Sequence, residues 1–351
     1  MKIPKTSVFI GALLVTMSSQ AASAQLLDVQ IDVPTDDRWQ YPFNAAPGLR
    51  ASAPTFAAIL VPGFDDRDAE FTIAFDTTND VTPGLAPSAY RTLRLTLTAT
   101  IENEEQFRYD PSYDPFTTYL DIDTDPEATV DADTGRPIEL FATGFFGGGL
   151  NSLNWVETSA FGGPPTVPPA QGSRFVRAVG LNPDGTVGAD FSNQIKDRFD
   201  VTPLAIGTTG DVAIGELVPA LTEFTFDIDL CSSGHAAYFA QALSEGRIIL
   251  TLSSLHPAAG GASGGIGDPT YPIFLTKDNP LAFLLDASPR LDMQVQVGSS
   301  ANYDGMGGVD FFDVLAFLSD FDARAPRADL NGDCVFDFFD VLAYLGEFDA
   351  G

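Results

Sequence analysis

The sequence predicts a mostly β protein, in which a large antiparallel β-sandwich precedes a small α-helical module of two loop–helix repeats. Between residues 25 and 298, apolar and polar residues alternate in short runs that turn residues separate. Near the C-terminus one phrase occurs twice, as Asp310-Phe-Phe-Asp-Val-Leu-Ala-Phe-Leu318 and as Asp337-Phe-Phe-Asp-Val-Leu-Ala-Tyr-Leu345. The pattern changes from period two to helical spacing just after Gly298-Ser299-Ser300, which sets the expected boundary.

The N-terminus has the order of a secretory signal peptide. Lys2 and Lys5 precede an apolar stretch over residues 8–15, and Ala22-Ser-Ala24 supplies a cleavage signal. The apolar stretch is too short to span a bilayer, so a lone membrane anchor is the less favoured alternative. We therefore expect a secreted or cell-surface protein, without a transmembrane segment, divided into a signal peptide (1–24), a β-sandwich (25–298) and the module (299–351).

Strict alternation of apolar and polar residues predicts strands with one buried and one solvated face, as in the antiparallel sheets of a sandwich. The runs that predict strands cover residues 27–33, 70–75, 91–99, 224–230, 246–252 and 291–297. Residues 236–245 are the one helical stretch expected here, ended by Gly246. Loops at 162–172 and 258–268 leave a division into two domains open, and we favour one.

The charge balance is strongly acidic, with 18 basic and 48 acidic residues and a net charge of −30. Such a chain repels nucleic acid and anionic membranes and attracts cations. Residues 301–351 contain 11 acidic and two basic residues, a surplus that a bound cation would offset. General surface acidity suited to a saline exterior is the alternative explanation.

The second repeat begins with a twelve-position loop that has EF-hand-like ligand spacing. Calcium takes six to eight oxygen ligands at about 2.3–2.6 Å, and alternate residues of a tight loop can supply them. Positions 1, 3, 5, 7, 9 and 12 hold Asp329, Asn331, Asp333, Val335 through its carbonyl, Asp337 and Asp340. Cys334 replaces the usual Gly of position 6, which alters the turn but removes no ligand. Leu342, Leu345 and Phe348 are expected to form one apolar helix face after it.

The first repeat offers a less complete ligand set. Its positions 1, 3, 7, 9 and 12 hold Asn302, Asp304, Gly308 through its carbonyl, Asp310 and Asp313. Met306 stands at position 5, and its thioether is a poor calcium ligand. We therefore expect one strong Ca²⁺ site and one degenerate site, with solvated acidic turns as the alternative.

Two such loops, each followed by a short helix at the end of a secreted chain, resemble a type I dockerin module. The repeated phrase also resembles the C-terminal dockerin-like anchoring modules of secreted planctomycete proteins. The resemblance covers residues 299–351. It implies two loop–helix halves related by a pseudo-twofold axis, Ca²⁺ in the loops, and a cohesin-like domain or another surface protein as partner.

The same resemblance implies that loop positions 10 and 11 contact the partner. Small hydroxyl residues are common there, but here the positions hold Phe311, Phe312, Phe338 and Phe339. Aromatic side chains are strong interface anchors, so the partner surface is expected to be apolar. In the alternative, one Phe of each pair packs inward, because neighbours on a helix point about 100° apart.

The remaining motifs are weaker indications of a functional site. Asp121-Ile-Asp123-Thr-Asp125 and Asp131-Ala-Asp133-Thr-Gly135 lack an acid at position 12, so we interpret them as exposed acidic loops. Gly261-Ala-Ser-Gly-Gly265 lacks the strand and helix of a nucleophile elbow. Cys231 and Cys334 are expected to be buried or free rather than paired, and two histidines are too few for a His-rich zinc site.

The β region resembles, without a specific motif, secreted jelly-roll modules, through Arg38-Trp-Gln-Tyr-Pro-Phe43 and Phe71-Thr-Ile-Ala-Phe-Asp76. Aromatic residues that might stack on a sugar are Trp39, Tyr41, Trp155 and Tyr271, although such residues more often fill a core. The sequence thus predicts a secreted, non-catalytic β-sandwich protein that its calcium-ordered module attaches to a partner. The alternative is a carbohydrate-binding or polysaccharide-degrading module, and a surface-layer or adhesion role is a third hypothesis.

Overall fold

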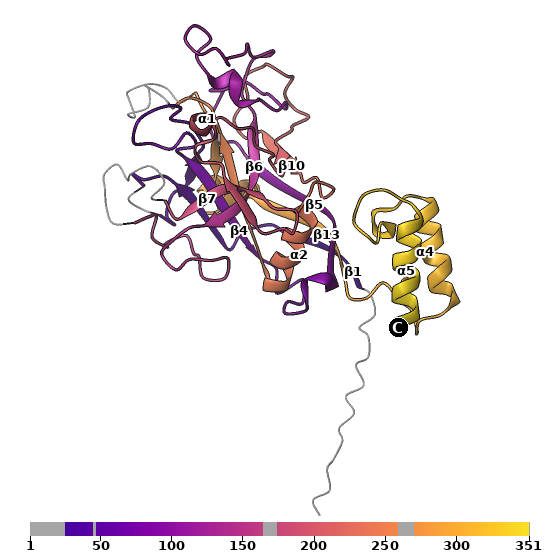
Figure 1. Ribbon diagram of the computed structural model, residues 1–351. Coiled ribbons are helices and arrows are strands. Elements are labelled where there is room, and N and C mark those ends of the chain that lie inside the picture. Colours follow the sequence, from indigo (N-terminus) through magenta and orange to yellow (C-terminus); the bar gives the residue numbers. More distant parts are fainter. Residues whose placement is uncertain (1–24, 45–46, 164–173, 259–269, 351) are drawn as a thin grey trace, which may run out of the picture.

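The computed structural model describes residues 25–44, 47–163, 174–258 and 270–350 (Figure 1). The expected signal peptide and the Gly261–265 motif lie outside these ranges. Within them, the chain is mostly β, and every strand pair of its sheets is antiparallel. No described helix is long and apolar enough to cross a membrane.

Two sheets carry most of the described strands. The smaller has the order β1 (Gln25–Ile31), β13 (Arg290–Val297), β5 (Tyr90–Thr100) and β10 (Glu223–Asp227). The larger has the order β2 (Asp36–Gln40), β4 (Glu70–Asp76), β11 (Arg247–Ser254), β6 (Ile138–Phe145), β7 (Val176–Leu181) and β8 (Val187–Asp190), with β9 (Ala205–Ile206) beside β6. A short pair joins β3 (Ser52–Pro54) to β12 (Ile273–Leu275).

The two sheets share one hydrophobic core. Leu95 and Leu97 of β5 and Met293 of β13 lie in the same buried cluster as Phe71 of β4 and Leu250 of β11. Alternate residues of each strand reach this layer because side chains of a strand point to opposite faces. All six predicted strands are therefore confirmed, and the arrangement is that of a β-sandwich.

The larger sheet is buried on both faces, which corrects the expectation of one solvated face per strand. On the face away from the shared core, Ala74 and Ile249 pack against Trp155 and Val176. The loops between strands fold back over this face, where small residues such as Ala74 leave room for them. Trp155 is fully buried, which excludes it from any sugar-stacking surface.

Short helices decorate the sandwich. Helix α2 (His235–Glu245) packs against β5 and β11 and ends at Gly246, whose φ of 80° is the left-handed cap that the sequence predicts. The others in the described sandwich are α1 (Gln194–Asp197), α3 (Pro280–Leu285), η1 (Pro87–Ala89) and η2 (Phe116–Tyr119).

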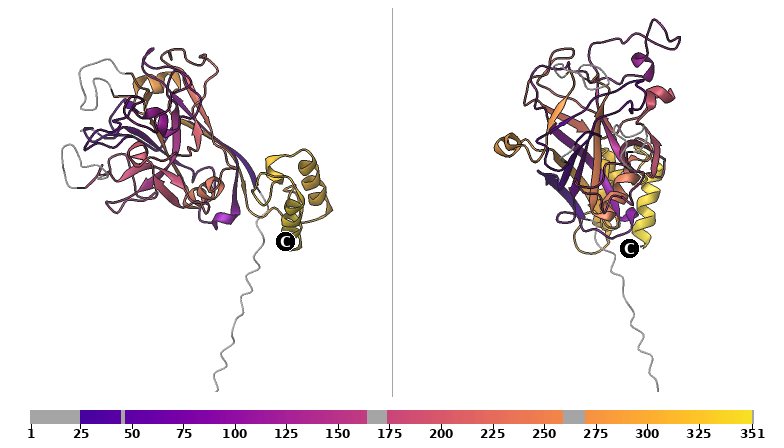
Figure 2. Two further views of the ribbon diagram at one scale, coloured as in Figure 1. Left: turned by 45° about the horizontal axis from the view of Figure 1, so that its top comes forward. Right: turned by 90° about the vertical axis from the view of Figure 1, so that its left-hand side faces the viewer.

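The C-terminal residues form a separate helical body beside the sandwich, as Figures 1 and 2 show. It contains α4 (Phe311–Asp322), η3 (Pro326–Ala328) and α5 (Phe338–Ala350). Its small core is distinct from that of the sandwich, and Phe317 stacks on Tyr344 there with ring centroids 4.3 Å apart. Buried aromatic rings of this kind stabilise a small body because each removes a large apolar area from water.

A disulfide joins the two bodies. Cys231, just before α2, is bonded to Cys334 in the second loop across 103 residues of sequence. The expectation that both cysteines are buried or free is therefore wrong, and both residues are exposed. The sequence separation concealed this pair, since only the placement of the module beside β10 brings the two residues together.

Candidate metal centre and docking surface

The second loop folds around the side chains that the sequence nominates as ligands. Asp329, which is nearly buried, accepts the N–H of Gly332 at 2.9 Å and that of Cys334 at 2.8 Å. Further along, Asp333 Oδ1 accepts the N–H of Val335 at 2.8 Å. Both oxygens of Asp329 and Oδ1 of Asp333 thus accept backbone N–H groups of the loop and shape its turn.

Asp340, at position 12, closes the loop from its far end. Its side chain is fully buried, Oδ1 accepts the N–H of Leu330 at 2.8 Å, and Oδ2 accepts the N–H of Asp337 at 3.0 Å. Asp337 in turn accepts the N–H of Phe339 at 2.7 Å, so the pair caps the N-terminus of α5. A carboxylate held in this way is pre-positioned at the loop and favours the helix that follows.

Cys334 occupies the turn position with a φ of 60°, close to the 71° of Gly307 at the equivalent position of the first loop. Non-glycine residues rarely adopt this left-handed region. Cys334 therefore makes the same turn as glycine, at a conformational cost, while its side chain is bonded to the sandwich.

The first loop repeats this geometry with fewer oxygens. Asp313 is fully buried and accepts the N–H groups of Asp304 at 3.0 Å and Asp310 at 2.7 Å. Met306 is 70% exposed, and its side chain supplies no oxygen ligand. The side-chain oxygen of Asn302 is buried without a hydrogen-bond partner among the described residues, an arrangement that a cation would satisfy.

The candidate donors of both loops are oxygen atoms, the type of ligand that a hard cation such as Ca²⁺ takes, and the second loop offers more of them than the first. Burial raises the pKa of the Asp329 carboxyl, amide donors from Cys334 and Gly332 lower it, and the charges of Asp340 and Asp333 raise it again. A bound cation would offset that crowding of negative charge. In the described chain, the carboxylate trios with oxygens within 4.8 Å lie in the sandwich instead.

All four phenylalanines of the repeat face solvent. Phe311, Phe312, Phe338 and Phe339 are 66, 65, 66 and 64% exposed, so the alternative in which one Phe of each pair points inward is wrong. They occupy the first turn of each helix, where the caps made by Asp310 and Asp337 fix them. The inward positions belong instead to Phe317 and Tyr344.

Two leucines extend each aromatic pair along its helix. Leu315 and Leu318 of α4 are 46 and 45% exposed, and Leu342 and Leu345 of α5 are 47 and 46% exposed. The expectation that Leu342, Leu345 and Phe348 form one apolar face is corrected accordingly, because Phe348 packs in the core with Val341 and Tyr344 whereas the two leucines are exposed. We call these eight exposed residues the apolar ridges, one per helix.

Sequence reasoning missed the leucines as surface residues, although the repeat itself contained the signal. Both copies keep Leu at the same two positions, three residues apart, which places the two leucines on one face of each helix beside the phenylalanines. Hydrophobicity alone suggested a core, and only the placement of Tyr344 against Phe317 shows which stripe is buried.

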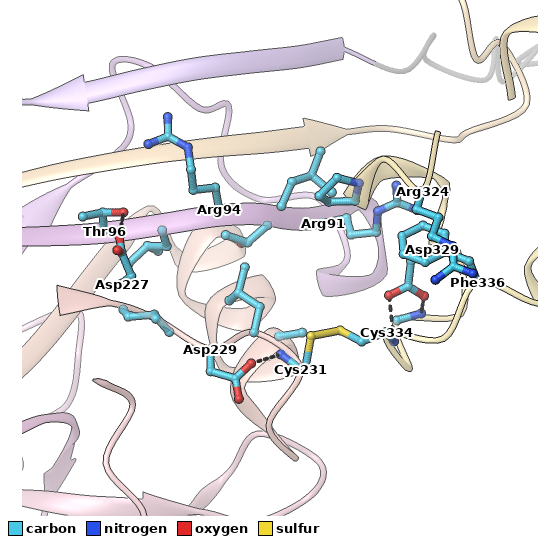
Figure 3. Close-up of a pocket in the computed structure, with 18 residues that line it drawn as sticks. Arg91, Arg94, Thr96, Asp227, Asp229, Cys231, Arg324, Asp329, Cys334 and Phe336 are labelled. Carbon is cyan, nitrogen blue, oxygen red and sulfur yellow. Dashed lines mark hydrogen bonds between the residues drawn. A yellow bond between two sulfur atoms is a disulfide. The ribbon is translucent and has the colours of Figure 1, made fainter. Parts of the chain in front are cut away.

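The second loop borders a cavity of about 590 Å³ between the module and the sandwich (Figure 3). In the close-up, the Cys231–Cys334 disulfide spans it, and Asp329 points its carboxylate back into its own loop. Nearby, Arg91 donates to the backbone carbonyl of Arg327, and the N–H of Ser300 donates to Glu347 at 2.5 Å. The first contact holds the η3 turn against β5, and the second joins α5 to the segment that follows β13.

Compared with known proteins, the sequence matches no family model and no curated protein.

Proposed function

We propose that this is a secreted, non-catalytic β-sandwich protein, which its dockerin-like C-terminal module attaches to a protein partner. The observation that carries the proposal is the pair of apolar ridges. Eight large apolar side chains are exposed on two helices whose other faces form a core. The exposed fraction of each side chain on one helix nearly equals that of its counterpart on the other. Contiguous exposed apolar surface on a small acidic body is typical of interaction sites.

The proposed partner is a cohesin-like domain or another surface protein with an apolar cradle for the phenylalanines. Asp310 and Asp337 directly precede the two aromatic pairs, and the described part of the module is rich in carboxylates. Complementary charge favours a partner whose cradle has a basic rim. Because the ridges repeat, the partner can engage either helix, in two orientations.

Calcium has an ordering role in this proposal. The same carboxylates that would hold the ion, Asp313 and Asp340, also fix the loop amides ahead of the two ridges. Ca²⁺ bound at the loops would therefore stabilise the first turns of α4 and α5, where the phenylalanines stand. Partner binding should then depend on Ca²⁺.

The test is capture of surface proteins from the source organism by the full chain, followed by affinity measurement with the purified partner. Phe311→Ala combined with Phe338→Ala should weaken that affinity at least about 30-fold, since buried aromatic anchors carry much of an interface. Phe283→Ala removes a still more exposed ring, from α3 of the sandwich, and is the control. Unchanged affinity in the double variant would refute the docking role of the ridges.

A carbohydrate-binding sandwich is the second candidate, and a cluster of partly exposed rings favours it. Trp39 stacks on Tyr41 with centroids 4.6 Å apart, and Phe56 links Tyr41 to Tyr271. Glycan-array binding by the full chain, lost in Tyr41→Ala, would support it. Absence of binding to any glycan on the array would favour a structural role for the sandwich. The assignment of the sandwich as a jelly roll stays a prediction.

A further inference from the structure

Three carboxylates meet in the loops that join β5 to β6. Asp110 and Asp114 come from the first part of that connection and Asp133 from the last, and one oxygen of each lies within 4.8 Å of the others. Two ligands on opposite sides of a calcium ion, each at about 2.4 Å, are about 4.8 Å apart. The three oxygens are therefore close enough to share one ion.

Asp110 gives an independent indication that something is bound there. Its side chain is 2% exposed, and Oδ1 accepts the N–H of Ser112 at 2.8 Å and its hydroxyl at 2.5 Å. Oδ2, in contrast, is buried without a hydrogen-bond partner in the described chain. The Ser112 hydroxyl, which contacts Oδ1, also lies 2.9 Å from Oδ2 of Asp133, so the oxygen without a partner belongs to a carboxylate that stands beside Asp133. A buried charged acceptor without a partner is unfavourable, and a cation would satisfy it.

The positive charge near the cluster is too small to balance it. Arg136 lies 2.8 Å from Oδ2 of Asp114 and 2.7 Å from Oδ2 of Asp131, and the Tyr119 hydroxyl also donates to Asp114 Oδ2, at 3.3 Å. These contacts leave the other oxygen of Asp114 available. Four carboxylates, counting Asp131 and Asp133, against one guanidinium give a net charge of −3 (1 − 4).

A second carboxylate trio in the sandwich has a lysine among its members, although its net charge is still −2 (1 − 3) and Oδ1 of Asp37 is also buried without a partner in the described chain. Asp37, Glu157 and Asp278 also lie within 4.8 Å of one another, but Lys277 stands among them. The ammonium of Lys277 lies 2.8 Å from Glu157 and 3.0 Å from Asp278, and the backbone N–H of the same residue donates to Asp37 at 2.6 Å. Lys277 thus contacts all three members of its trio, whereas the ion pairs of Arg136 in the described chain are with Asp114 and Asp131 and not with Asp110 or Asp133.

We infer that Asp110, Asp114 and Asp133 form a calcium site in the sandwich, separate from the C-terminal loops. The donors of the cluster are all oxygen atoms, without His or Cys, which selects a hard cation. Three carboxylates from irregular loops suit the flexible coordination of Ca²⁺ better than the near-octahedral demand of Mg²⁺. Asp133 is exposed, so water can complete the coordination from that side.

Gly135 explains how the two stretches approach so closely. A Cβ at this position would lie 2.8 Å from the Cβ of Asp110, and its φ of 137° is one that other residues rarely adopt. The sequence pattern Asp131-Ala-Asp133-Thr-Gly135 was therefore part of a site whose remaining ligands stand about twenty residues earlier. The bound ion would pin the ends of the connection between β5 and β6 to each other.

The test is the number of calcium ions bound by the full chain, measured by equilibrium dialysis against 1 mM free Ca²⁺ with elemental analysis. Asp110→Asn should lower the count by one, both alone and in the background Asp329→Asn with Asp340→Asn. Asp123→Asn, an exposed carboxylate in the same connection, is the matched control and should leave the count unchanged. An unchanged count in Asp110→Asn would overturn the inference, whatever happens at the C-terminal loops.

A thermal measurement separates loss of the ion from loss of the fold. In a chelator, Asp110→Asn should melt no lower than the unsubstituted chain, because it removes a charge from a crowded cluster. In Ca²⁺, the unsubstituted chain should gain more in Tm than the variant does. A variant that already melts lower in the chelator, with an equal gain from Ca²⁺, would contradict a metal role for Asp110.

Discussion

The two halves of the C-terminal module have the same outer surface on different loops. Residues 311–318 and 338–345 expose equivalent Phe and Leu side chains to within a few per cent, yet the twelve-position loops 302–313 and 329–340 differ at seven positions, among them ligand and turn positions. The second loop has Asp329, Asp333 and Cys334 where the first has Asn302, Met306 and Gly307. The surface is thus more evenly repeated than the ligand set, which favours the proposed docking role over metal storage as what the two halves share.

The halves also differ in their attachment. Only the second loop is bonded to the sandwich, through Cys334, and the contact of Arg91 with Arg327 lies on the same side. If a partner binds in its two orientations with different affinities, we expect this asymmetry of attachment to be the physical reason. Each of the following experiments changes one of these differences.

Removing the disulfide should have the largest effect. Replacing Cys231 and Cys334 by Ser should lower the free energy of unfolding by about 2–4 kcal/mol, because the bond closes a long loop. Hydrogen exchange should accelerate in residues 329–337 much more than in residues 302–310. Equal acceleration in both loops would mean that the disulfide does not distinguish the halves.

Neutralising the buried position-12 carboxylates should separate the two sites. Asp340→Asn should weaken the tighter calcium site by about 10- to 100-fold, or roughly 1.4–2.7 kcal/mol, since an amide has one acceptor oxygen and no charge. Asp313→Asn should affect only the weaker site. Calorimetric titration of the full chain with Ca²⁺ measures both, and the assignment of strong and weak loops fails if Asp313→Asn alone removes the tighter event.

Restoring the absent oxygen should make the halves more alike. Met306→Asp places a carboxylate at position 5 of the first loop, where the side chain is exposed and easily replaced. We expect the weaker site to tighten about tenfold, or roughly 1.4 kcal/mol. Met306→Leu supplies no oxygen and should leave the titration as it was.

The ridges should contribute least to stability. Phe311→Ala and Phe338→Ala should each change the free energy of unfolding by under about 0.5 kcal/mol, because both rings are exposed. Chemical denaturation of the single variants measures this directly, with Phe283→Ala as the control. A loss above about 3 kcal/mol would place the ring in a core.

Much of the fold could be predicted from the sequence, because alternation carries direct information on strands. The run 91–99 became β5 (Tyr90–Thr100), and the run 291–297 became β13 (Arg290–Val297). The cover over the outer face of the larger sheet could not be predicted, since the loops that carry Trp155 have no period. Whether these loops cover the sheet depends on where the chain folds back over it, and the local sequence pattern does not encode that.

The candidate sites show the same limit. The ligand positions of residues 329–340 are local in sequence, so spacing alone nominates them. The Cys231–Cys334 bond and the trio of Asp110, Asp114 and Asp133 each join stretches that are distant in sequence, so no local spacing brings their members together. Which apolar stripe of α5 is buried depended on Tyr344 meeting Phe317, a contact between the two repeats.

The most direct test of the account is hydrogen exchange of the full chain in Ca²⁺ and in a chelator. If calcium orders the docking surface, Ca²⁺ should slow exchange at least about tenfold, or roughly 1.4 kcal/mol, in both loops and in the first turns of α4 and α5. The slowing should be larger for residues 329–341 than for 302–314. Identical exchange in the module with and without Ca²⁺ would contradict the calcium-ordered docking surface.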